Sequence, residues 1–383
     1  MSNTQRITLA SFLAYFVMSG MLAPIGIISG PMAEHFGREV TAVTADFSWL
    51  TVGILIGAVM ALFAFDRGGL RPWTVALYVL IALSIGAAAG IDTPQAVRLA
   101  LGAVGVACGL GLAAAALAIS LSYAPAKRAS ALVATDACFS TAGIATAWLA
   151  TQGVTRGWAW SSAYVAVAGV AVLVALLALS ARYPSAVADD TTSHGGRWPA
   201  GVWLCVATLF LYTLGQQSLL FWLPNHLSTV HGVPLGRAGG VVGQFWTGMF
   251  VAQLLVTAAV LKTGARPIAL LAVLTTTLGA MPLLLVTDID ALLVLALVWG
   301  VANLGLLKVV LSFATELVSV PPPRLVSLLL LGATSGTAVA PKLSSTVVEM
   351  SNTATVLQFG VGCYAAMALL FYAAALRQPR TES

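Results

Sequence analysis

Charged side chains are scarce in this sequence. Only 8% of its 383 residues are Asp, Glu, Lys or Arg, and 59% are hydrophobic. Soluble domains carry about 25% charged residues, so most of this surface cannot face water. The scarcity excludes an ordinary soluble protein. It also makes an ionisable group inside an apolar stretch a candidate functional residue, because burying a charge in lipid costs roughly 3 kcal/mol.

Metal, nucleotide and catalytic motifs are missing as well. The four cysteines, Cys108, Cys138, Cys205 and Cys363, are scattered through apolar segments without the CxxC or His-flanked spacing of a metal site. The sequence has no P-loop for ATP-driven pumping. It also has no paired catalytic aspartates, no Ser–His dyad and no loop long enough for a receptor's signalling domain. These absences predict a protein that is not an enzyme and needs no cofactor or metal.

Long apolar runs fill the chain instead. A helix of at least 18 apolar residues spans about 30 Å of hydrocarbon, and continuous runs indicate helices rather than the alternating strands of a barrel. The sequence therefore predicts an all-α membrane protein with twelve transmembrane helices. They lie near residues 8–33, 44–65, 72–90, 95–122, 130–152, 158–181, 199–227, 237–261, 267–286, 291–317, 325–348 and 354–376.

The basic residues are distributed unevenly between the two sides of these spans. With the N-terminus in the cytoplasm, only Arg38, Arg156 and Arg237 fall on the opposite side. The cytoplasmic segments hold Arg6, Arg67, Arg71, Lys127, Arg128, Arg182, Arg197, Lys262, Arg266, Arg324, Arg377 and Arg380. This bias follows the positive-inside rule and places both termini in the cytoplasm. The net charge of +5 is therefore explained by the membrane topology of the chain, and it does not indicate nucleic-acid binding. The first run is too long for a cleavable signal and is expected to remain as a helix.

The chain divides into two halves. The most polar stretch, Tyr183 to Arg197, lies between the sixth and seventh spans and predicts a cytoplasmic linker. We therefore expect six-helix bundles at residues 1–182 and 198–383, joined by residues 183–197. A displacement of 195 positions places Gly53 on Gly248 and Gly105 on Gly300. It also aligns two G-x-R-P loops, at residues 69–72 and 264–267. Six spans in each half predict parallel repeats with a binding site at their interface.

This organisation resembles the major facilitator superfamily. Asp66-Arg67-Gly68-Gly69-Leu70-Arg71 is similar to the family's D-R-x-G-x-[RK] loop after the second helix. Arg156-Gly157-Trp158-Ala159-Trp160 is similar to its G-W-x-W entry to the sixth helix. The resemblance implies a transporter fold in a bacterial inner membrane, functional as a monomer. It also implies that Asp66, Arg67, Gly69 and Arg71 form a conformational motif that stabilises the outward-open state, with Asp66 near the start of the eleventh helix.

A narrower resemblance is to TsgA-like transporters, which are related to the fucose permeases. Thr135-Asp136-Ala137-Cys138-Phe139-Ser140-Thr141-Ala142-Gly143 resembles their T-D-x-x-F-S-x-A-G. Gly215-Gln216, Trp222-Leu223-Pro224 and Phe245-Trp246 match further positions. The chain departs from that group at Lys308, Lys342 and Gln244, so the resemblance does not identify a substrate for this chain.

Four ionisable residues within the spans are candidates for gating or proton coupling. Asp136 and Lys308 lie toward the cytoplasmic ends of the fifth and tenth spans, and Asp46 and Lys342 toward the outer ends of the second and eleventh. We hypothesise two pairs between the halves, Asp136–Lys308 as an inner gate and Asp46–Lys342 as an outer gate. Alternatively, Asp46 and Lys342 reach the membrane interface independently of each other.

Polar groups in the spans are candidates for substrate binding. Amides and hydroxyls orient a small ligand, and an indole ring supplies an apolar wall. The alternative role of the Gln and Asn side chains is to bridge helices by hydrogen bonds. The candidates are Tyr15, Gln216, Gln217, Gln244, Trp246, Asn303 and Lys308.

The function predicted from these features is secondary active transport. The expected partners are the lipid bilayer, a small polar or charged solute and protons, with movement by alternating access. The alternative is an exporter of an amphiphilic compound such as a drug or siderophore. Sequence separates the two poorly, because import and export use the same machinery.

Overall fold

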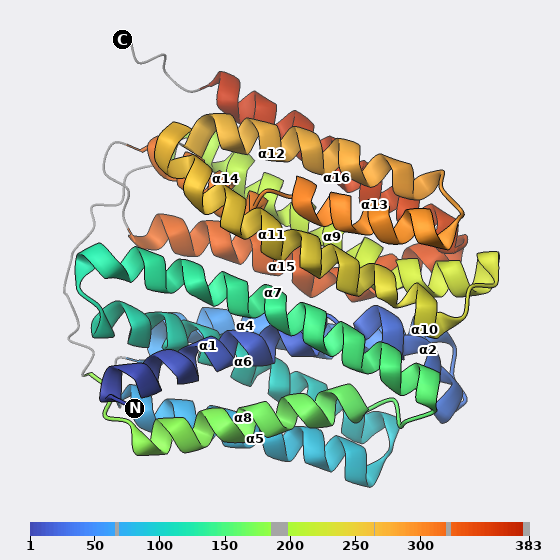
Figure 1. Cartoon of the computed structure of the whole chain (residues 1–383), viewed down its shortest axis with the longest axis horizontal. Helices are drawn as coiled ribbons and strands as arrows, with labels where there is room; N and C mark the ends of the chain where they lie inside the picture. Colours follow the sequence, from blue (N-terminus) through green and yellow to red (C-terminus); the bar gives the residue numbers. More distant parts are fainter. Residues whose placement is uncertain (66–68, 185–197, 264, 319–322, 378–383) are drawn as a thin grey trace.

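A computed structural model describes residues 1–65, 69–184, 198–263, 265–318 and 323–377. Within these residues the chain is helical and has no strands (Figure 1). The start of α1 and the end of α16 lie at one end of the molecule, and α2 and α10 lie at the other. The chain ahead of the predicted linker forms α1 (Asn3–Leu22), α2 (Ile25–Phe36), α3 (Val40–Asp46), α4 (Ser48–Ala64), α5 (Leu70–Ile91), α6 (Pro94–Ser122), α7 (Pro125–Arg156) and α8 (Ser162–Ser180).

The second part repeats this arrangement with a different set of helix breaks. It forms α9 (Ala200–His231), α10 (Leu235–Ala238), α11 (Gly240–Thr263), α12 (Ala265–Ala280), the 3-10 turn η1 (Met281–Leu284), α13 (Ile289–Ala302), α14 (Leu306–Glu316), α15 (Pro323–Met350) and α16 (Thr353–Leu376).

Twelve long helical spans run through the described part of the chain, and up to eleven of them are apolar enough to cross a membrane. In the described residues, ten helical segments are long and apolar enough to cross a membrane, and the pair α1–α2, bent by 52°, makes an eleventh. The long helix α7 is the twelfth. Each corresponds to one of the spans predicted from the sequence, so the all-α, twelve-helix fold is confirmed. The boundaries of the two halves remain a prediction, because residues 185–197 of the linker lie outside the described chain.

The glycines that align at a displacement of 195 residues make equivalent helix contacts. A Cβ built on Gly53 of α4 would lie 3.0 Å from the Cα of Gly105 in α6. A Cβ on Gly248 of α11 would lie 2.9 Å from the Cα of Gly300 in α13. Small residues allow such close backbone approach. The two parts of the chain therefore share one packing solution, as parallel repeats require.

Three of the spans are broken at identifiable residues. Pro24 follows α1, and its missing amide hydrogen ends the regular hydrogen bonding there. Phe47 separates α3 from α4. The third break lies between α13 and α14, where Leu304 and Gly305 have positive φ angles of 44° and 59°. This break turns the start of α14 toward the centre of the molecule.

The two parts of the chain meet closely at the end that holds α2 and α10. A Cβ on Gly26 of α2 would lie 2.3 Å from the carbonyl oxygen of Leu220 in α9. A Cβ on Gly236 of α10 would lie 2.4 Å from the Thr155 hydroxyl of α7. The Thr51 hydroxyl of α4 donates to the Ala338 carbonyl of α15 at 2.9 Å. These contacts hold the two parts of the chain together at this end of the molecule.

Candidate functional site: a cavity between the two parts of the chain

A cavity of about 260 Å³ lies between the two parts of the chain. Helices α1, α4, α6 and α7 line it from one side, and α9, α11, α14 and α15 from the other. Five of the predicted binding residues line this cavity: Tyr15, Gln216, Gln217, Trp246 and Lys308. Its position between the repeats is where a transporter of this organisation binds its solute.

Lys308 and Asp136 form an ion pair across this cavity. The Lys308 Nζ lies 3.4 Å from the Asp136 Oδ2, and the two side chains are 51% and 19% exposed. The sequence analysis predicted this contact between the fifth and tenth spans. The Lys308 side chain lines the cavity and is about half exposed, so it has room for contacts besides Asp136. Its role as a gate remains a prediction.

The break before α14 determines where Lys308 points. Gly305 caps the N-terminus of α14 in a left-handed conformation, and Lys308 occupies the first turn. Gly305 and Leu307 line the cavity together with Lys308. The N-terminus of a helix carries partial positive charge, which disfavours a lysine and favours an anion. Asp136 supplies that negative charge here.

The segment that resembles T-D-x-x-F-S-x-A-G presents one face of α7 to the other half. Asp136, Phe139, Ser140 and Gly143 are spaced i, i+3, i+4 and i+7, which places them on one side of a helix. Phe139 packs edge-on against Trp246 at 5.6 Å between ring centroids. The Ser140 hydroxyl donates to the Gln253 Oε1 at 3.1 Å.

Gly143 completes this face because no larger residue fits. A Cβ at this position would lie 2.5 Å from the indole ring of Trp246. Close contact between α7 and α11 therefore depends on glycine here. Each of the four residues on this face of α7 therefore makes one contact with the other half, Asp136 with α14 and the other three with α11.

Two predicted binding residues do not line the cavity. Gln244 lies on α11 but outside the cavity wall. Asn303 is fully buried and donates from its Nδ2 to the Trp299 carbonyl at 2.7 Å. Asn303 immediately precedes the break, where regular helical hydrogen bonding stops. The structure therefore places Asn303 at the break rather than in the cavity wall, and its predicted contact with substrate stays a prediction.

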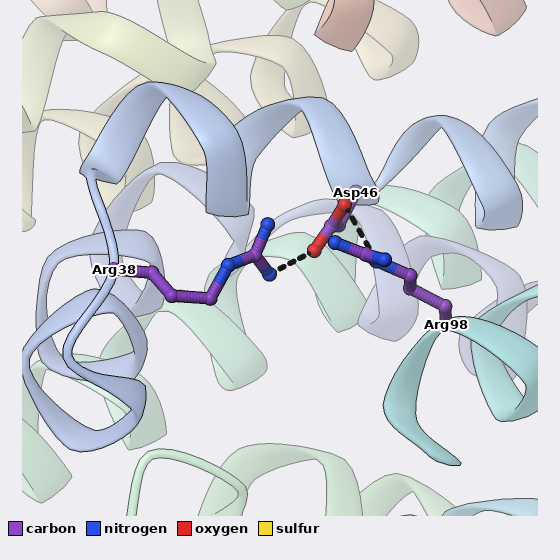
Figure 2. Close-up of polar contacts among 3 residues, drawn as sticks. All are labelled: Arg38, Asp46 and Arg98. Carbon is purple, nitrogen blue, oxygen red and sulfur yellow. Dashed lines mark hydrogen bonds and ion pairs between the residues drawn. The ribbon is translucent and has the colours of Figure 1, made fainter. Parts of the chain in front are cut away.

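The predicted outer pair Asp46–Lys342 is not formed among the described residues, where Asp46 has other partners, and its role as a gate stays a prediction. Asp46 ends α3 and binds two arginines of its own half (Figure 2). Arg38, in the loop after α2, donates from Nη1 to the Asp46 Oδ2. The Nε of Arg98, near the start of α6, lies 2.9 Å from the Asp46 Oδ1. With the Asp46 side chain only 12% exposed, these two arginines compensate its charge.

Lys342 lies on a different face of α15 from the one packed inside the molecule. Its neighbours Pro341, Ser344 and Ser345 are buried, whereas Lys342 and Leu343 are exposed. In the described residues Lys342 makes no ion pair with Asp46. Its exposure agrees with the alternative in which a lysine extends to the membrane interface independently.

Replacing Asp46 with Asn should destabilise the protein. The change leaves the guanidinium groups of Arg38 and Arg98, which are 22% and 34% exposed, without a counter-charge. We expect a loss of about 2 kcal/mol, measured as a lower Tm of the purified protein in detergent. Asp290→Asn is the matched control, because the Arg237–Asp290 pair has side chains 53% and 71% exposed and should change stability by about 0.5 kcal/mol or less. Equal effects of both substitutions would show that the Asp46 cluster has no special structural role.

The predicted conformational motif is only partly described. Asp66 and Arg67 lie outside the described residues. Gly69 precedes α5 in an extended conformation, and Arg71 donates to the Leu179 carbonyl at the end of α8 at 2.5 Å. Arg71 thus joins α5 to α8 within one half, and the proposed role of the motif stays a prediction.

The cavity also contains residues that the sequence analysis did not identify. Gln253, Thr213 and Thr337 line it, together with the broken segment at Gly305. The hydroxyl of Thr213 donates to the Ala333 carbonyl at 2.6 Å, which joins α9 to α15. A signal for Gln253 was present, since it is an amide in an apolar span and lies seven residues after Trp246.

Comparison with known proteins agrees with this architecture. Protein TsgA homolog of Serratia proteamaculans (strain 568) is 26% identical over 379 residues, covering 96% of this chain and 94% of that protein. Protein TsgA of Shigella flexneri is 25% identical, covering 97% of this chain and 95% of that protein.

Solved transporter structures share the fold at low identity. A mutant of the nucleoside transporter NupG has a TM-score of 0.77 at 14% identity, covering 97% of this chain and all of that one (100%). The D-xylose-proton symporter has a TM-score of 0.72 at 13% identity, covering 99% of this chain and 98% of that one.

The family itself is identified from the sequence match. Residues 7–341 match the family model of the Major Facilitator Superfamily. This match covers most of the chain and agrees with the twelve spans, the paired glycine contacts and the cavity between the repeats. The chain therefore belongs to the major facilitator superfamily and is a multi-pass membrane transport protein, similar to TsgA proteins, rather than an enzyme.

Proposed function

We propose that this protein is a secondary active transporter that carries a small polar or charged solute across the bacterial inner membrane in step with protons. The observation that supports this most directly is the Asp136–Lys308 pair, which lies in a cavity between the two halves. Charges at this depth are rarely retained without a role in transport or coupling.

Proton coupling follows from what happens when the pair opens. If the halves move apart or a solute takes the place of one partner, the other is left as an isolated charge in an apolar region, which is unfavourable. A proton on the Asp136 carboxylate removes one of these charges, and Lys308 then remains free to bind the solute. Opening of the pair, solute binding and protonation are linked in this way.

The proposed orientation places both termini in the cytoplasm, as the distribution of basic residues predicts. In that orientation the closed end with α2 and α10 faces outward. The conformation described here is then inward-facing, with Lys308 accessible from the cytoplasm. Alternating access would open the contacts of Gly26 and Thr51 and close the opposite end.

Export of an amphiphilic compound is the second candidate. Apolar side chains form much of the cavity wall, including Met18, Leu22, Met249 and Leu330. An amphiphile would bury its apolar part against this wall and place its polar group at Lys308. The alternating-access machinery would be the same, with the direction set by the gradients.

Uptake into proteoliposomes tests the proposed function. Nucleosides and D-xylose are suitable first solutes because the structural neighbours are named for them, and a panel of radiolabelled organic acids extends the range. We expect at least one solute to accumulate when an inward proton gradient is imposed and to equilibrate without accumulation when a protonophore is added. Accumulation of a solute that ignores the pH gradient, with Asp136→Asn behaving as wild type, would contradict proton coupling through this pair.

A further inference from the structure

We infer that the solute is a small organic anion, carrying a single carboxylate or a group of equal charge, and that one proton moves with each anion. This inference rests on the proposed transport function and specifies the chemistry of its substrate. It depends on three features of the cavity: the start of α14, an indole N–H without a partner, and the balance of charge between Lys308 and Asp136.

The start of α14 is an electropositive point on the cavity wall. Lys308 lies in its first turn, and Gly305 and Leu307 line the cavity beside it. The Lys308 side chain is 51% exposed, so its ammonium has room for a second partner besides Asp136. Helix N-termini carry a partial positive charge that favours anionic groups. The break in this span thus presents a cation and a helix N-terminus to the same space.

Trp246 provides an independent indication of a bound acceptor. Its side chain lines the cavity, yet the residue is only 4% exposed, and its Nε1 has no hydrogen-bond partner among the described residues. An indole N–H can only donate. A buried donor without an acceptor costs about 1–3 kcal/mol in general. This nitrogen is buried from solvent in the present conformation, so a ligand oxygen would satisfy it once the indole turns it toward the cavity.

These groups favour a ligand that brings acceptors. Lys308 and Trp246 have no acceptor atoms on their polar groups. The Gln253 Oε1 already accepts from Ser140 at 3.1 Å, and Asp136 is engaged by Lys308. The rings of Phe139 and Trp246 offer an apolar wall beside these donors. An organic acid with a short apolar or aromatic body matches these donors, and the side-chain amides of Gln216 and Gln217 on the same wall add both donors and acceptors for its other polar groups.

The charge balance gives the stoichiometry. Among the described residues that line the cavity, Lys308 and Asp136 are the only charged ones. The empty cavity is therefore neutral, with one ammonium and one carboxylate. When a monoanion replaces Asp136 at Lys308, the cavity gains one negative charge, and a proton taken up by the Asp136 carboxylate restores neutrality. The empty protein and the protein loaded with one anion and one proton therefore both have a neutral cavity. Neither moves net charge across the membrane when it changes conformation, so transport of one anion with one proton is electroneutral.

Binding of matched acids and amides to the purified protein tests this inference without requiring transport. The probes are acetate with acetamide, benzoate with benzamide, and nicotinate with nicotinamide, titrated by calorimetry. We expect at least one acid to bind wild type about tenfold more tightly than its amide, since hydrogen bonds to charged groups exceed neutral ones. Titrations in buffers of different ionisation enthalpy should show uptake of about one proton for each anion bound.

Substitutions assign these effects to particular residues. Lys308→Met should remove the preference for the acid, and Lys308→Arg should keep it. Lys342→Met is the matched control, because Lys342 lies outside the cavity, and it should bind as wild type. Asp136→Asn should bind the acid without taking up a proton. The inference is overturned if no acid binds more tightly than its own amide, or if the preference survives in Lys308→Met.

The outcomes separate this inference from the proposed function. If acids bind as described but no solute enters proteoliposomes, the anion site stands and the transport proposal fails. If an uncharged solute accumulates through Asp136 while no acid is preferred, transport stands and the anionic substrate is wrong. For a transported anion, uptake that changes with membrane potential at constant pH gradient would overturn electroneutrality.

Discussion

Lys308→Met and Asp136→Asn should each abolish proton-driven accumulation of the solute, down to the level of liposomes without protein. The Lys308 Nζ and the Asp136 Oδ2 lie 3.4 Å apart. Each substitution removes one member of this pair and leaves the other charge in the cavity without a partner. Breaking a buried pair is more costly than removing both members, because the remaining charge is uncompensated. The double variant should therefore be more stable than the less stable of the two single variants, although it lacks the group that holds the solute and should not accumulate it.

The two single variants should fail in different ways. Asp136→Asn cannot release a proton, so it should lose accumulation but still exchange labelled for unlabelled solute across the membrane. Lys308→Met should lose exchange as well, because it lacks the group that holds the solute. Lys342→Met and Asp290→Asn serve as controls, since neither residue lines the cavity. If the double variant is no more stable in detergent than the less stable single variant, Asp136 and Lys308 do not act as a pair.

The sequence was sufficient to predict the fold and one of the two hypothesised charge pairs, Asp136–Lys308. The run lengths fix twelve spans because a helix must bury its backbone groups within lipid. The Asp136–Lys308 contact was predictable because few charges exist in the spans and each needs compensation. The sequence does not determine the rotation of each helix about its own axis. Depth can be counted along a helix, whereas the direction of a side chain depends on which neighbours pack against it.

Helix α11 illustrates this limit. Trp246, Met249 and Gln253 line the cavity at spacings of i, i+3 and i+7. At about 100° per residue, Gln244 points about 160° away from Trp246. The two residues could not both face one cavity from a regular helix. Periodicity alone would have removed Gln244 and suggested Gln253, once Trp246 was placed.

Asp46 and Lys342 show a second limit, the choice of partner. Both residues were expected toward the outer ends of their spans, but Asp46 is satisfied by Arg38 and Arg98 within its own half. Arg38 becomes available only because the chain turns between α2 and α3. Hydropathy treats 8–33 and 44–65 as two simple spans and gives no information on this turn. Similarly, the break at Leu304 and Gly305 determines the direction of the Lys308 side chain. In the sequence, Gly305 was the one indication of a break at this position.

Gly26→Val should shift the transporter away from the conformation described here. A Cβ at Gly26 would lie 2.3 Å from the Leu220 carbonyl oxygen and 2.8 Å from that of Phe221. Both atoms belong to the backbone of α9 and cannot rotate away, so α2 and α9 must separate. Overpacking of this kind costs about 1–3 kcal/mol. That energy changes the ratio of closed to open molecules at this end by about 5- to 150-fold.

A single cysteine at Thr51 measures this shift. Thr51 is fully buried at the closed end, where its hydroxyl donates to Ala338 of α15. With the four native cysteines replaced, Thr51→Cys should react slowly with a membrane-impermeant maleimide added outside. Adding Gly26→Val should speed the reaction, and uptake of solute should fall because the inward-facing state is depleted. Gly169→Val is the matched control, since a Cβ there meets no atom within 4 Å. Because Gly169 makes no contact between the halves, any rise in reactivity common to both valine variants would reflect general loosening. Only a rise confined to Gly26→Val assigns closure to the approach of α2 and α9.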